Sequence, residues 1–483
     1  MNETILAIDI GSTKICAIIA EVEVDRIQII GHGISKSQGV KKGVITNIEL
    51  ASKSIKKAIN DAKRISGSNV SIATISISNA YAKSLNATGI VNITQRDISV
   101  KEIERVIRNA LYNANVPTEY DVIHVLPYNF KVDDQDFIED PYGMNASRME
   151  VDVNIIMTQK SSLSNLVKAV RSAGVDIDGI VLNGYAAAIA TMGEDEKELG
   201  VAVIDMGGQT SNQIIHTGNS IRYNDFLSIG SNHITNDLSM ALHTPLQIAE
   251  NVKKRYGNLI NDSTDVIELP VIGDEENKNE VSLEIVHSVI LARVEEALML
   301  LAKSVDKSLL KEQIGSGIIL TGGMTKLKGI RELAQAIFDG MPVRIAQPED
   351  KDIGGLFDEL KDPAFSTVIG LLLYRAGKHT EYEINIKNEL LHSKHTQTDE
   401  LEEIRKIGSL REGKKTDLGN IELEETIKAA KNKREREETA RKDKEENREK
   451  PKSEEFIFED LPTDPSEGVN PIKKLANWAR QLF

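Results

Sequence analysis

The sequence has few of the residues that stabilise small secreted domains, and none of the long apolar runs that span membranes. Of its 483 residues, one is a cysteine, Cys16, and one is a tryptophan. A single thiol excludes a disulfide framework or a cysteine metal site within the chain, and in an apolar strand it is expected to be a buried small hydrophobe. No stretch of about 18 uncharged apolar residues occurs, so no membrane-spanning helix is predicted.

An excess of positive charge is also absent. The formal net charge is −15, which argues against general nucleic-acid binding. The first residues do not look like a secretory signal, because Glu3 stands where a basic segment is needed and Asp9 and Lys14 interrupt the apolar run. We therefore expect a cytoplasmic protein. The chain is longer than one ordinary domain, and its hydrophobic content of 40% provides for a large core.

Two similar segments, far apart in the chain, each join an acidic residue to a turn of small residues. In residues 5–20 an apolar strand ends at Asp9, passes through a turn and re-enters an apolar strand, and residues 200–218 repeat this order around Asp205. The turns consist of Gly11, Ser12, Thr13 and Lys14 in the first segment, and of Gly207, Gly208, Gln209 and Thr210 in the second. Because each turn lies between β-branched runs, both segments are predicted to be β-hairpins. Together they predict a duplicated fold with a ligand between its halves.

The composition of the two turns suits a nucleotide phosphate. Glycine and small hydroxyl residues let backbone N–H groups surround an anion. Asp9 and Asp205 would hold a hydrated Mg²⁺ on the phosphates, since this ion keeps several waters and needs few protein oxygens. Lys14 adds a positive charge beside the first turn. Neither turn has the Walker spacing. The alternative is two ordinary hairpins with exposed aspartates.

Two further features are candidates for nucleotide contacts. Glu250 and Lys253 stand three residues apart on one face of a helical segment predicted within residues 228–256. Such a pair could bind the hydroxyls of a ribose, and a surface ion pair is the alternative. Gly322 and Gly323 follow a buried strand and lead into a helix. Close backbone approach to a flat base would explain them, although this kind of turn is common.

The rest of the folded region alternates strands and helices. Helices are predicted at 47–62, 100–113, 161–173, 183–192, 282–306 and 364–377, and strands at 70–78, 89–94, 121–132, 149–157 and 177–182. The order strand, helix, strand, strand within residues 85–158 suits a small α+β insertion. The helices at 183–192 and 364–377 are rich in small residues, which permit close packing at a contact between two lobes.

The character of the chain changes after residue 386, where the folded body is expected to end. Residues 431–450 carry a charge at sixteen of twenty positions, with both signs mixed. No core can form from such a composition, so residues 387–470 are predicted to be a disordered charged linker.

Residues 471–483 are predicted to form an amphipathic helix that lies on a membrane surface. Pro471 suits a first helical position. One side would carry Ile472, Leu475, Trp478, Ala479, Leu482 and Phe483, and the other Lys473, Lys474 and Arg480. With a length of roughly 20 Å the helix is too short to span a bilayer, so it would bind the interface of an anionic membrane. The alternative is a helix that docks on the protein's own body.

Several motifs in a fixed order indicate a family. The segments AIDIGSTK, the alanine-rich helix, VIDMGGQTS, TGG and the C-terminal small-residue helix resemble the actin, Hsp70 and sugar-kinase superfamily. Within it, the chain resembles the bacterial cell-division FtsA family. The specific motifs are VKKGVITNIE at 40–49, the DPYGM segment within 125–151, AENVKKRYG at 249–257, ILARVEEAL at 290–298, PVRIAQP at 342–348 and DPAFSTVIGLLLY at 362–374. The resemblance covers residues 4–378 and the C-terminal tip.

The resemblance implies an actin-like α/β fold with two duplicated lobes. Lobe 1 would hold subdomain 1A, made of residues 1–84, 159–198 and 351–386, and the inserted subdomain 1C, made of residues 85–158. Lobe 2 would hold subdomain 2A, made of residues 199–229 and 315–350, and subdomain 2B, made of residues 230–314.

The resemblance also implies ATP and Mg²⁺ as cofactors. The two aspartates would position the ion through water, the two turns would hold the β- and γ-phosphates, the acid–base pair would meet the ribose, and the third glycine turn would flank the adenine. The residues implied are Asp9, Gly11, Ser12, Thr13, Lys14, Asp205, Gly207, Gly208, Gln209, Thr210, Glu250, Lys253, Gly322, Gly323 and Met324. Gln209 stands where the family pattern usually has a glycine, and Asn212 where an acidic residue is frequent. ATP binding tolerates these changes more easily than ATP hydrolysis does. We therefore expect weak or no ATPase activity, and no catalytic residue is assigned.

The function implied is that of a tether in cell division. The protein would assemble actin-like protofilaments, link FtsZ filaments to the cytoplasmic face of the inner membrane as a peripheral protein, and help to assemble other divisome proteins at the septum. Arg293 and Glu296 would receive the C-terminal peptide of FtsZ, unless they merely pair with each other. Two alternatives stay open: a small-molecule kinase of the same superfamily, for which no general base is evident, and a pilus-assembly adaptor of similar shape.

Overall fold

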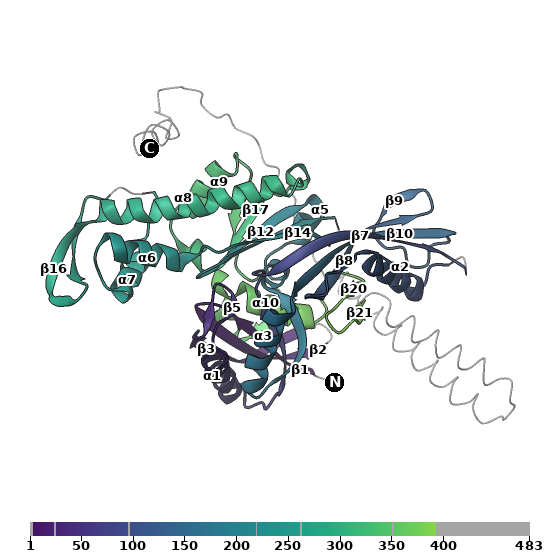
Figure 1. The fold of residues 1–483 in the computed structure, drawn as a ribbon, viewed down its shortest axis with the longest axis horizontal. Coiled ribbons are helices and arrows are strands. Elements are labelled where there is room, and N and C mark those ends of the chain that lie inside the picture. Colours follow the sequence, from purple (N-terminus) through teal and green to yellow (C-terminus); the bar gives the residue numbers. More distant parts are fainter. Residues whose placement is uncertain are drawn as a thin grey trace, which may run out of the picture. The chain divides into compact units, whose positions relative to one another are not determined.

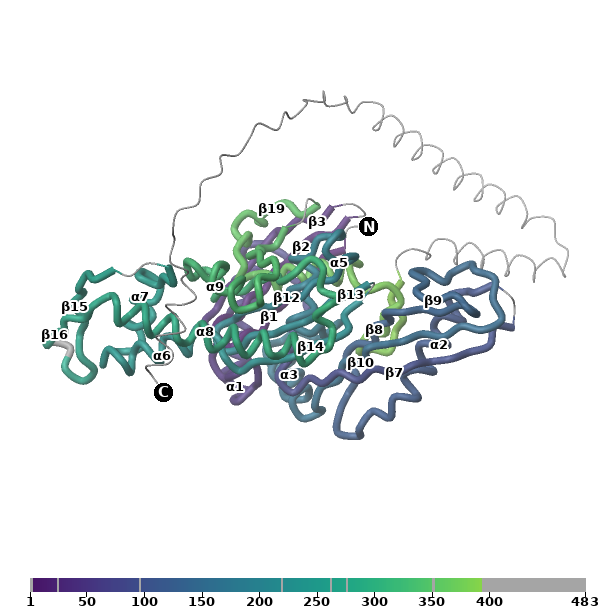
Figure 2. The backbone as a smooth tube through the Cα atoms, turned by 90° about the horizontal axis from the view of Figure 1, so that it is seen from above, coloured from purple at the N-terminus to yellow at the C-terminus, as the bar shows by residue number. Residues whose placement is uncertain are grey.

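The computed structural model describes residues 3–392 except 24–25, 95–96, 219, 261–262 and 350–351. The predicted tip at 471–483 and the predicted linker from residue 393 onward lie outside the described residues. Figure 1 shows the described elements along the chain, and Figure 2 shows the same backbone from above.

The first sheet is built around the N-terminal hairpin. Its strands are β1 (Glu3–Ile10), β2 (Lys14–Glu23), β3 (Arg26–Lys36), β6 (Ile72–Ile77), β11 (Asp176–Leu182) and β19 (Ile353–Gly355), in the order β11-β6-β1-β2-β3-β19. Helix α1 (Ile48–Ser66) packs on β2 and β3, and also contacts α3 (Lys160–Ser172). The Asn47 side chain caps α1 by accepting a hydrogen bond from the Leu50 N–H. Cys16 is fully buried in this sheet, as expected.

The second sheet repeats the plan of the first. It contains β12 (Val201–Met206), β13 (Ser211–Thr217), β14 (Ser220–Leu227), β17 (Ile318–Thr321) and β18 (Val343–Ile345), in the order β14-β13-β12-β17-β18. In the first sheet β1 pairs antiparallel with β2 and parallel with β6, and in the second β12 pairs antiparallel with β13 and parallel with β17. Asp9 lies opposite Cys16 in one hairpin, and Asp205 opposite Asn212 in the other. The predicted hairpins and their duplication are confirmed.

Two small-residue helices lie against each other beside these sheets. They are α4 (Asn183–Ile189) and α10 (Ser366–Arg375). A Cβ atom on Gly370 would lie 1.7 Å from the Ala186 carbonyl oxygen, so this approach requires glycine. The predicted close packing of the two helices is confirmed, and α10 also packs on β1, β2 and β6.

Lobe 2 continues into helices that share its core. These elements are α6 (Ser231–Ala241), α7 (Leu246–Tyr256), the hairpin β15 (Val266–Val271) and β16 (Asp274–Ser282), α8 (Leu283–Lys307) and α9 (Ile330–Ile337). Figure 1 shows α6 and α7 beside the long helix α8, and the three helices contact one another. The segment predicted to be helical within 228–256 is divided into α6 and α7, because Pro245 has no N–H to continue the helix.

The insertion has its own sheet and core. Strands β7 (Ala82–Asn92), β8 (Tyr120–Val132), β9 (Gln135–Ile138) and β10 (Arg148–Gln159) accompany helix α2 (Val100–Asn113). Helix α2 has the predicted bounds and packs on β7 and β10. Strand β14 of lobe 2 contacts the insertion sheet, and the Asn154 amide donates to the Ile221 carbonyl oxygen at 3.0 Å.

The chain beyond α10 returns to the insertion. Strands β20 (Glu383–Ile384) and β21 (Leu390–Leu391) extend its sheet, giving the order β21-β20-β8-β10-β7. Ile384 pairs with Val125 on β8. Strand β21 lies beyond residue 386, inside the range expected to be linker, because pairing here satisfies backbone groups at the edge of the insertion sheet.

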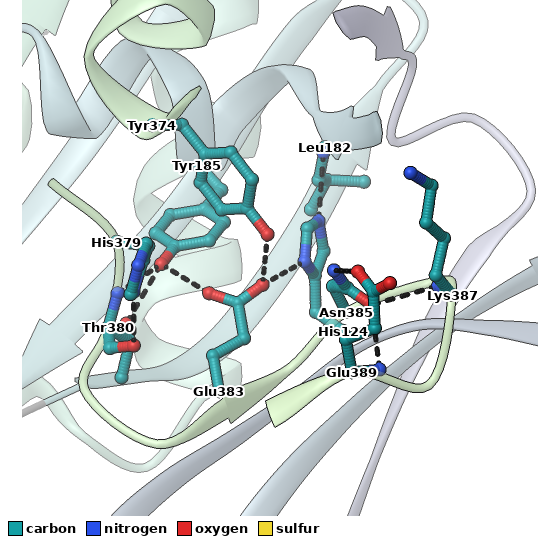
Figure 3. Close-up of polar contacts among 10 residues, drawn as sticks. All are labelled: His124, Leu182, Tyr185, Tyr374, His379, Thr380, Glu383, Asn385, Lys387 and Glu389. Atoms are coloured by element: carbon teal, nitrogen blue, oxygen red, sulfur yellow. Dashed lines mark hydrogen bonds and ion pairs between the residues drawn. The ribbon is translucent and has the colours of Figure 1, made fainter. Parts of the chain in front are cut away.

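A buried carboxylate fixes this returning segment (Figure 3). His124 Nδ1 lies 2.6 Å from Glu383 Oε1, and both side chains are fully buried. The Leu182 N–H donates to His124 Nε2 at 3.1 Å, so the imidazole carries its proton on Nδ1 and donates it to Glu383. The hydroxyls of Tyr374 and Tyr185 donate to Oε1 and Oε2 at 2.8 and 2.9 Å. Burial holds the pKa of both tyrosines well above its usual value, so both remain donors.

Replacing Glu383 with alanine is expected to lower the free energy of unfolding by about 3 kcal/mol, because the buried donors His124 and Tyr374 lose their acceptor and Tyr185 keeps only Thr380. Glu389→Ala is the matched control, since this exposed glutamate of the same segment bonds only to its neighbour Asn385 in the described structure. Urea and thermal unfolding of both variants measure the difference. Equal and small losses for the two variants would contradict a structural role for Glu383.

Candidate functional site

The two hairpin acids lie near each other at the ends of their strands. Burial and the negative charge of Asp9 raise the pKa of Asp205 to about 6, against hydrogen bonds from Asn212 and Thr367. Burial also raises the pKa of Asp9, while Lys14 and the Ser76 hydroxyl, which donates to Asp9 at 3.0 Å, oppose this shift. Two neighbouring carboxyls whose ionised forms are both disfavoured fit a site that a hydrated cation completes.

The Lys14 side chain points to an anion at the same place. Its ammonium nitrogen is buried, and no group in the described part of the chain accepts a hydrogen bond from it. It lies 3.5 Å from the centre of the Phe365 ring, and burial lowers its pKa. A buried ammonium without an acceptor is costly, so a phosphate oxygen would fit here.

The two small-residue turns have the same geometry and meet each other. The Gly11 N–H donates to the Lys14 carbonyl oxygen at 3.1 Å, and the Gly207 N–H donates to that of Thr210 at 2.8 Å. A Cβ atom on Gly208 would lie 1.7 Å from the Thr13 hydroxyl oxygen, so glycine is needed where the turns touch. The structure therefore brings the predicted phosphate residues of both lobes together.

The third glycine turn joins the second acid. Gly322 has a φ of 90°, and a Cβ atom there would lie 2.4 Å from Asp205 Oδ1. Its N–H donates to the Pro363 carbonyl oxygen at 3.1 Å. Gly323 begins a short 3-10 helix, and the Met324 side chain is buried in the core of lobe 2. This turn thus lies beside the acids, while Met324 contributes to packing.

Glu250 and Lys253 form an ion pair in a partly buried network. Lys253 Nζ lies 2.6 Å from Glu250 Oε2 and donates to the Ser231 carbonyl oxygen at 3.0 Å. The Thr235 hydroxyl donates to Glu250 Oε2 at 2.6 Å. Glu250 lines a cavity of about 690 Å³ that also includes Thr13 and Gln209, whereas Lys253 lies behind it with 8% of its side chain exposed.

Several residues around the two acids, Lys14 and the adjoining cavity were not predicted from the sequence. Ser76 on β6 and Phe365 before α10 touch the charged groups directly, and Lys36, Lys41 and Lys42 line the cavity. Ser76 had a weak sequence signal, since it is one of two hydroxyl residues, with Thr74, in a strand that is otherwise apolar. The two adjacent lysines stood in a quoted motif but had no assigned role.

Arg293 and Glu296 lie on α8, where Arg293 is already paired. Its Nε and Nη2 atoms lie 2.5 and 3.1 Å from the two carboxylate oxygens of Asp237 on α6, and its Nη1 bonds to Glu296. The two predicted partner-binding residues therefore contact each other, as the alternative proposed, and Arg293 also pairs with Asp237.

Neither a preformed metal cluster nor a membrane-spanning helix is present among the described residues. Within them, no cluster of three or more His, Cys, Asp or Glu side chains is arranged to hold a metal ion, so an ion here would need water and phosphate oxygens as further ligands. None of the described helices has the length and apolar character that crossing a membrane requires.

Comparison with known proteins adds to this picture. Residues 202–370 match the family described as cell division protein FtsA, and residues 79–157 match the SHS2 domain inserted in FtsA. The chain is 41% identical to the cell division protein FtsA of Helicobacter pylori strain J99 over 417 residues, which cover 80% of this chain and 84% of that protein. It is 35% identical to FtsA of Pseudomonas aeruginosa over 384 residues, which cover 79% and 91%.

Among solved structures, the PilM–PilN type IV pilus biogenesis complex matches with a TM-score of 0.56 at 16% identity, covering 77% of this chain and 98% of that one. This likeness shows the fold alone. The predicted actin-like α/β fold with an inserted subdomain is confirmed. On these matches, the chain belongs to the FtsA family of cell division proteins.

Proposed function

We propose that the cleft between the two hairpins binds Mg·ATP. The observation that carries this proposal is the buried Lys14 ammonium, which has no acceptor among the described residues and is near enough to Asp9 and Asp205 to feel their charges. A nucleotide phosphate would satisfy the ammonium and the turn N–H groups. Mg²⁺ would neutralise part of the phosphate charge, and Asp9 and Asp205 would accept hydrogen bonds from its waters.

Binding with weak or no hydrolysis fits the side chains of the second turn. The Asn212 amide donates to Asp205 Oδ2 at 3.3 Å, so it supplies no carboxylate that could orient an attacking water. The side-chain amide oxygen of Gln209, Oε1, accepts a hydrogen bond from the Lys42 N–H at 2.8 Å. We assign no general base in this cleft.

Asp205→Ala is expected to weaken Mg·ATP binding at least about tenfold, because one of the two acceptors for the ion's waters is lost. Wild-type affinity should also fall as the pH drops through about 6, since the raised pKa of Asp205 leaves this carboxyl protonated below that value. Titration calorimetry measures both effects. Asp195→Ala, at an exposed aspartate of α5 (Glu194–Leu199), is the control. Wild-type affinity in Asp205→Ala would show that the ion lies elsewhere.

We further propose that the protein tethers FtsZ filaments to the cytoplasmic face of the inner membrane at the septum. Membership of the FtsA family supports a role in cell division. The amphipathic pattern of residues 471–483, outside the described structure, supports a peripheral anchor for anionic lipids. Such a short anchor binds reversibly, so self-association into protofilaments would strengthen attachment by multivalency, and other divisome proteins would join the assembly.

Trp478→Glu is expected to release the protein from vesicles of phosphatidylglycerol and phosphatidylethanolamine, because it places a charge at the centre of the apolar side. Asn477→Glu adds the same charge to the polar side and should retain most of the binding. Flotation with ATP present measures the bound fraction. Failure of the wild type to float, or equal losses in both variants, would refute the membrane anchor.

Subdomain 2B, with α8, is the proposed receptor for the C-terminal peptide of FtsZ. Arg293 would meet an acidic or carboxylate group of the peptide while it keeps its bond to Asp237, and would exchange its contact with Glu296 for the peptide. This exchange is possible because Arg293 is partly exposed and Glu296 is half exposed.

Arg293→Glu is expected to lower the affinity for a labelled FtsZ peptide by about tenfold or more, because an attractive charge becomes a repulsive one. Lys303→Glu reverses the same charge at an exposed position of α8 and should leave the affinity near that of the wild type. Fluorescence anisotropy gives both constants, and thermal unfolding checks that each variant is folded. An unchanged affinity in folded Arg293→Glu would place the peptide elsewhere.

The two alternative functions have less support. A kinase needs a general base beside the terminal phosphate, and we assign none in the cleft. The pilus-assembly adaptor rests on a structural likeness that shows the fold alone, whereas the curated relatives reported above are cell division proteins.

A further inference from the structure

A small hairpin beside the phosphate turns carries two lysines. Strands β4 (Val40–Lys41) and β5 (Val44–Ile45) pair antiparallel around Lys42 and Gly43, and we call residues 40–45 the lysine turn. Lys42 and Gly43 have φ values of 48° and 79°, the left-handed pair of a tight two-residue hairpin. A Cβ atom on Gly43 would lie 2.1 Å from the Ser78 hydroxyl oxygen, so the tip packs closely against Ser78 and requires glycine here.

Both N–H groups at the tip are bound by side chains of the two phosphate turns. The Gly43 N–H donates to the Ser12 hydroxyl at 2.8 Å, and the Lys42 N–H donates to Gln209 Oε1 at 2.8 Å. Ser12 belongs to lobe 1, as the lysine turn does, whereas Gln209 belongs to lobe 2. The bond between Lys42 and Gln209 therefore crosses the cleft.

Gln209 makes this bond only because it is not glycine. A glycine at this position would have no side chain to reach the lysine turn. Here the amide oxygen is used by Lys42, and the side chain is partly buried between the lobes. The side chain at this position therefore has a structural role in this chain.

The bond holds positive charge beside the phosphate turns. Lys36, Lys41 and Lys42 have exposed side chains and line the cavity of about 690 Å³ together with Thr13 and Gln209. Glu250 is the acid among the described residues that line this cavity. Cations held near an anion site raise the local concentration and the affinity of the more highly charged ligand.

We propose that Gln209 is a positioning residue that fastens the lysine turn across the cleft, so that its lysines favour a triphosphate over a diphosphate nucleotide. This inference rests on the nucleotide binding proposed above. A triphosphate carries more negative charge than a diphosphate, so it gains more from cations held in place than from cations on a loose turn.

The first test needs no nucleotide. Gln209→Met keeps the side-chain length but removes the acceptor, and amide hydrogen exchange in the peptide spanning residues 39–46 should become about threefold to tenfold faster. Gln209→Glu keeps an acceptor oxygen and should restore the slow exchange. Gln335→Met, at an exposed position of α9, is the control. Exchange in Gln209→Met that equals the wild-type rate would overturn the proposal.

The second test compares Mg·ATP with Mg·ADP by titration calorimetry. In Gln209→Met the ratio of the two affinities should fall about threefold to tenfold, and in the wild type the ratio should fall as salt is raised. A merely structural loss would lower both affinities alike, and that outcome would overturn the proposal. A wild type that binds neither nucleotide would refute the proposed function and the selection together, while the exchange test would still show whether the bond between Lys42 and Gln209 exists.

Discussion

The candidate nucleotide site is organised around one buried positive charge, the ammonium group of Lys14. The buried Lys14 ammonium has no acceptor in the described part of the chain, and the two nearby carboxyls have raised pKa values. Such an arrangement costs folding energy unless a ligand with both an anion and a cation completes it. The fold supports this arrangement with two equivalent hairpins whose turns touch at Gly208, and with the close contact of Gly370 against α4. The buried charges of Lys14, Asp9 and Asp205 are therefore the clearest sign of function in the described structure.

Helix α10 connects this cleft with the other buried polar site. At its beginning, Phe365 covers Lys14 and Thr367 bonds to Asp205, and near its end Tyr374 donates to Glu383. Glu383 in turn holds the segment that completes the insertion sheet. One helix of ten residues thus contributes side chains to both the candidate nucleotide site and the attachment of the segment that carries β20 and β21.

Sequence patterns within a short stretch of chain predicted the hairpins and the longer helices correctly. The hairpins around Asp9 and Asp205, and helix α2 to its exact bounds, follow from alternation, turn composition and helical period. Strands β20 and β21 were not predicted, because strands of two residues have no period and their partner lies far away in the chain. The bond between Gln209 and Lys42 was missed for a similar reason, since it joins residues separated by 167 positions. The family resemblance supplied the fold, but contacts of this kind belong to the individual chain.

A structure of the protein with Mg²⁺ and a non-hydrolysable ATP analogue tests the central claim most directly. The account predicts a phosphate oxygen about 3 Å from the Lys14 ammonium, the turn N–H groups of both hairpins directed at the phosphates, and the ion between Asp9 and Asp205 with water in its shell. A nucleotide bound elsewhere, with the Lys14 ammonium still lacking an acceptor, would contradict it.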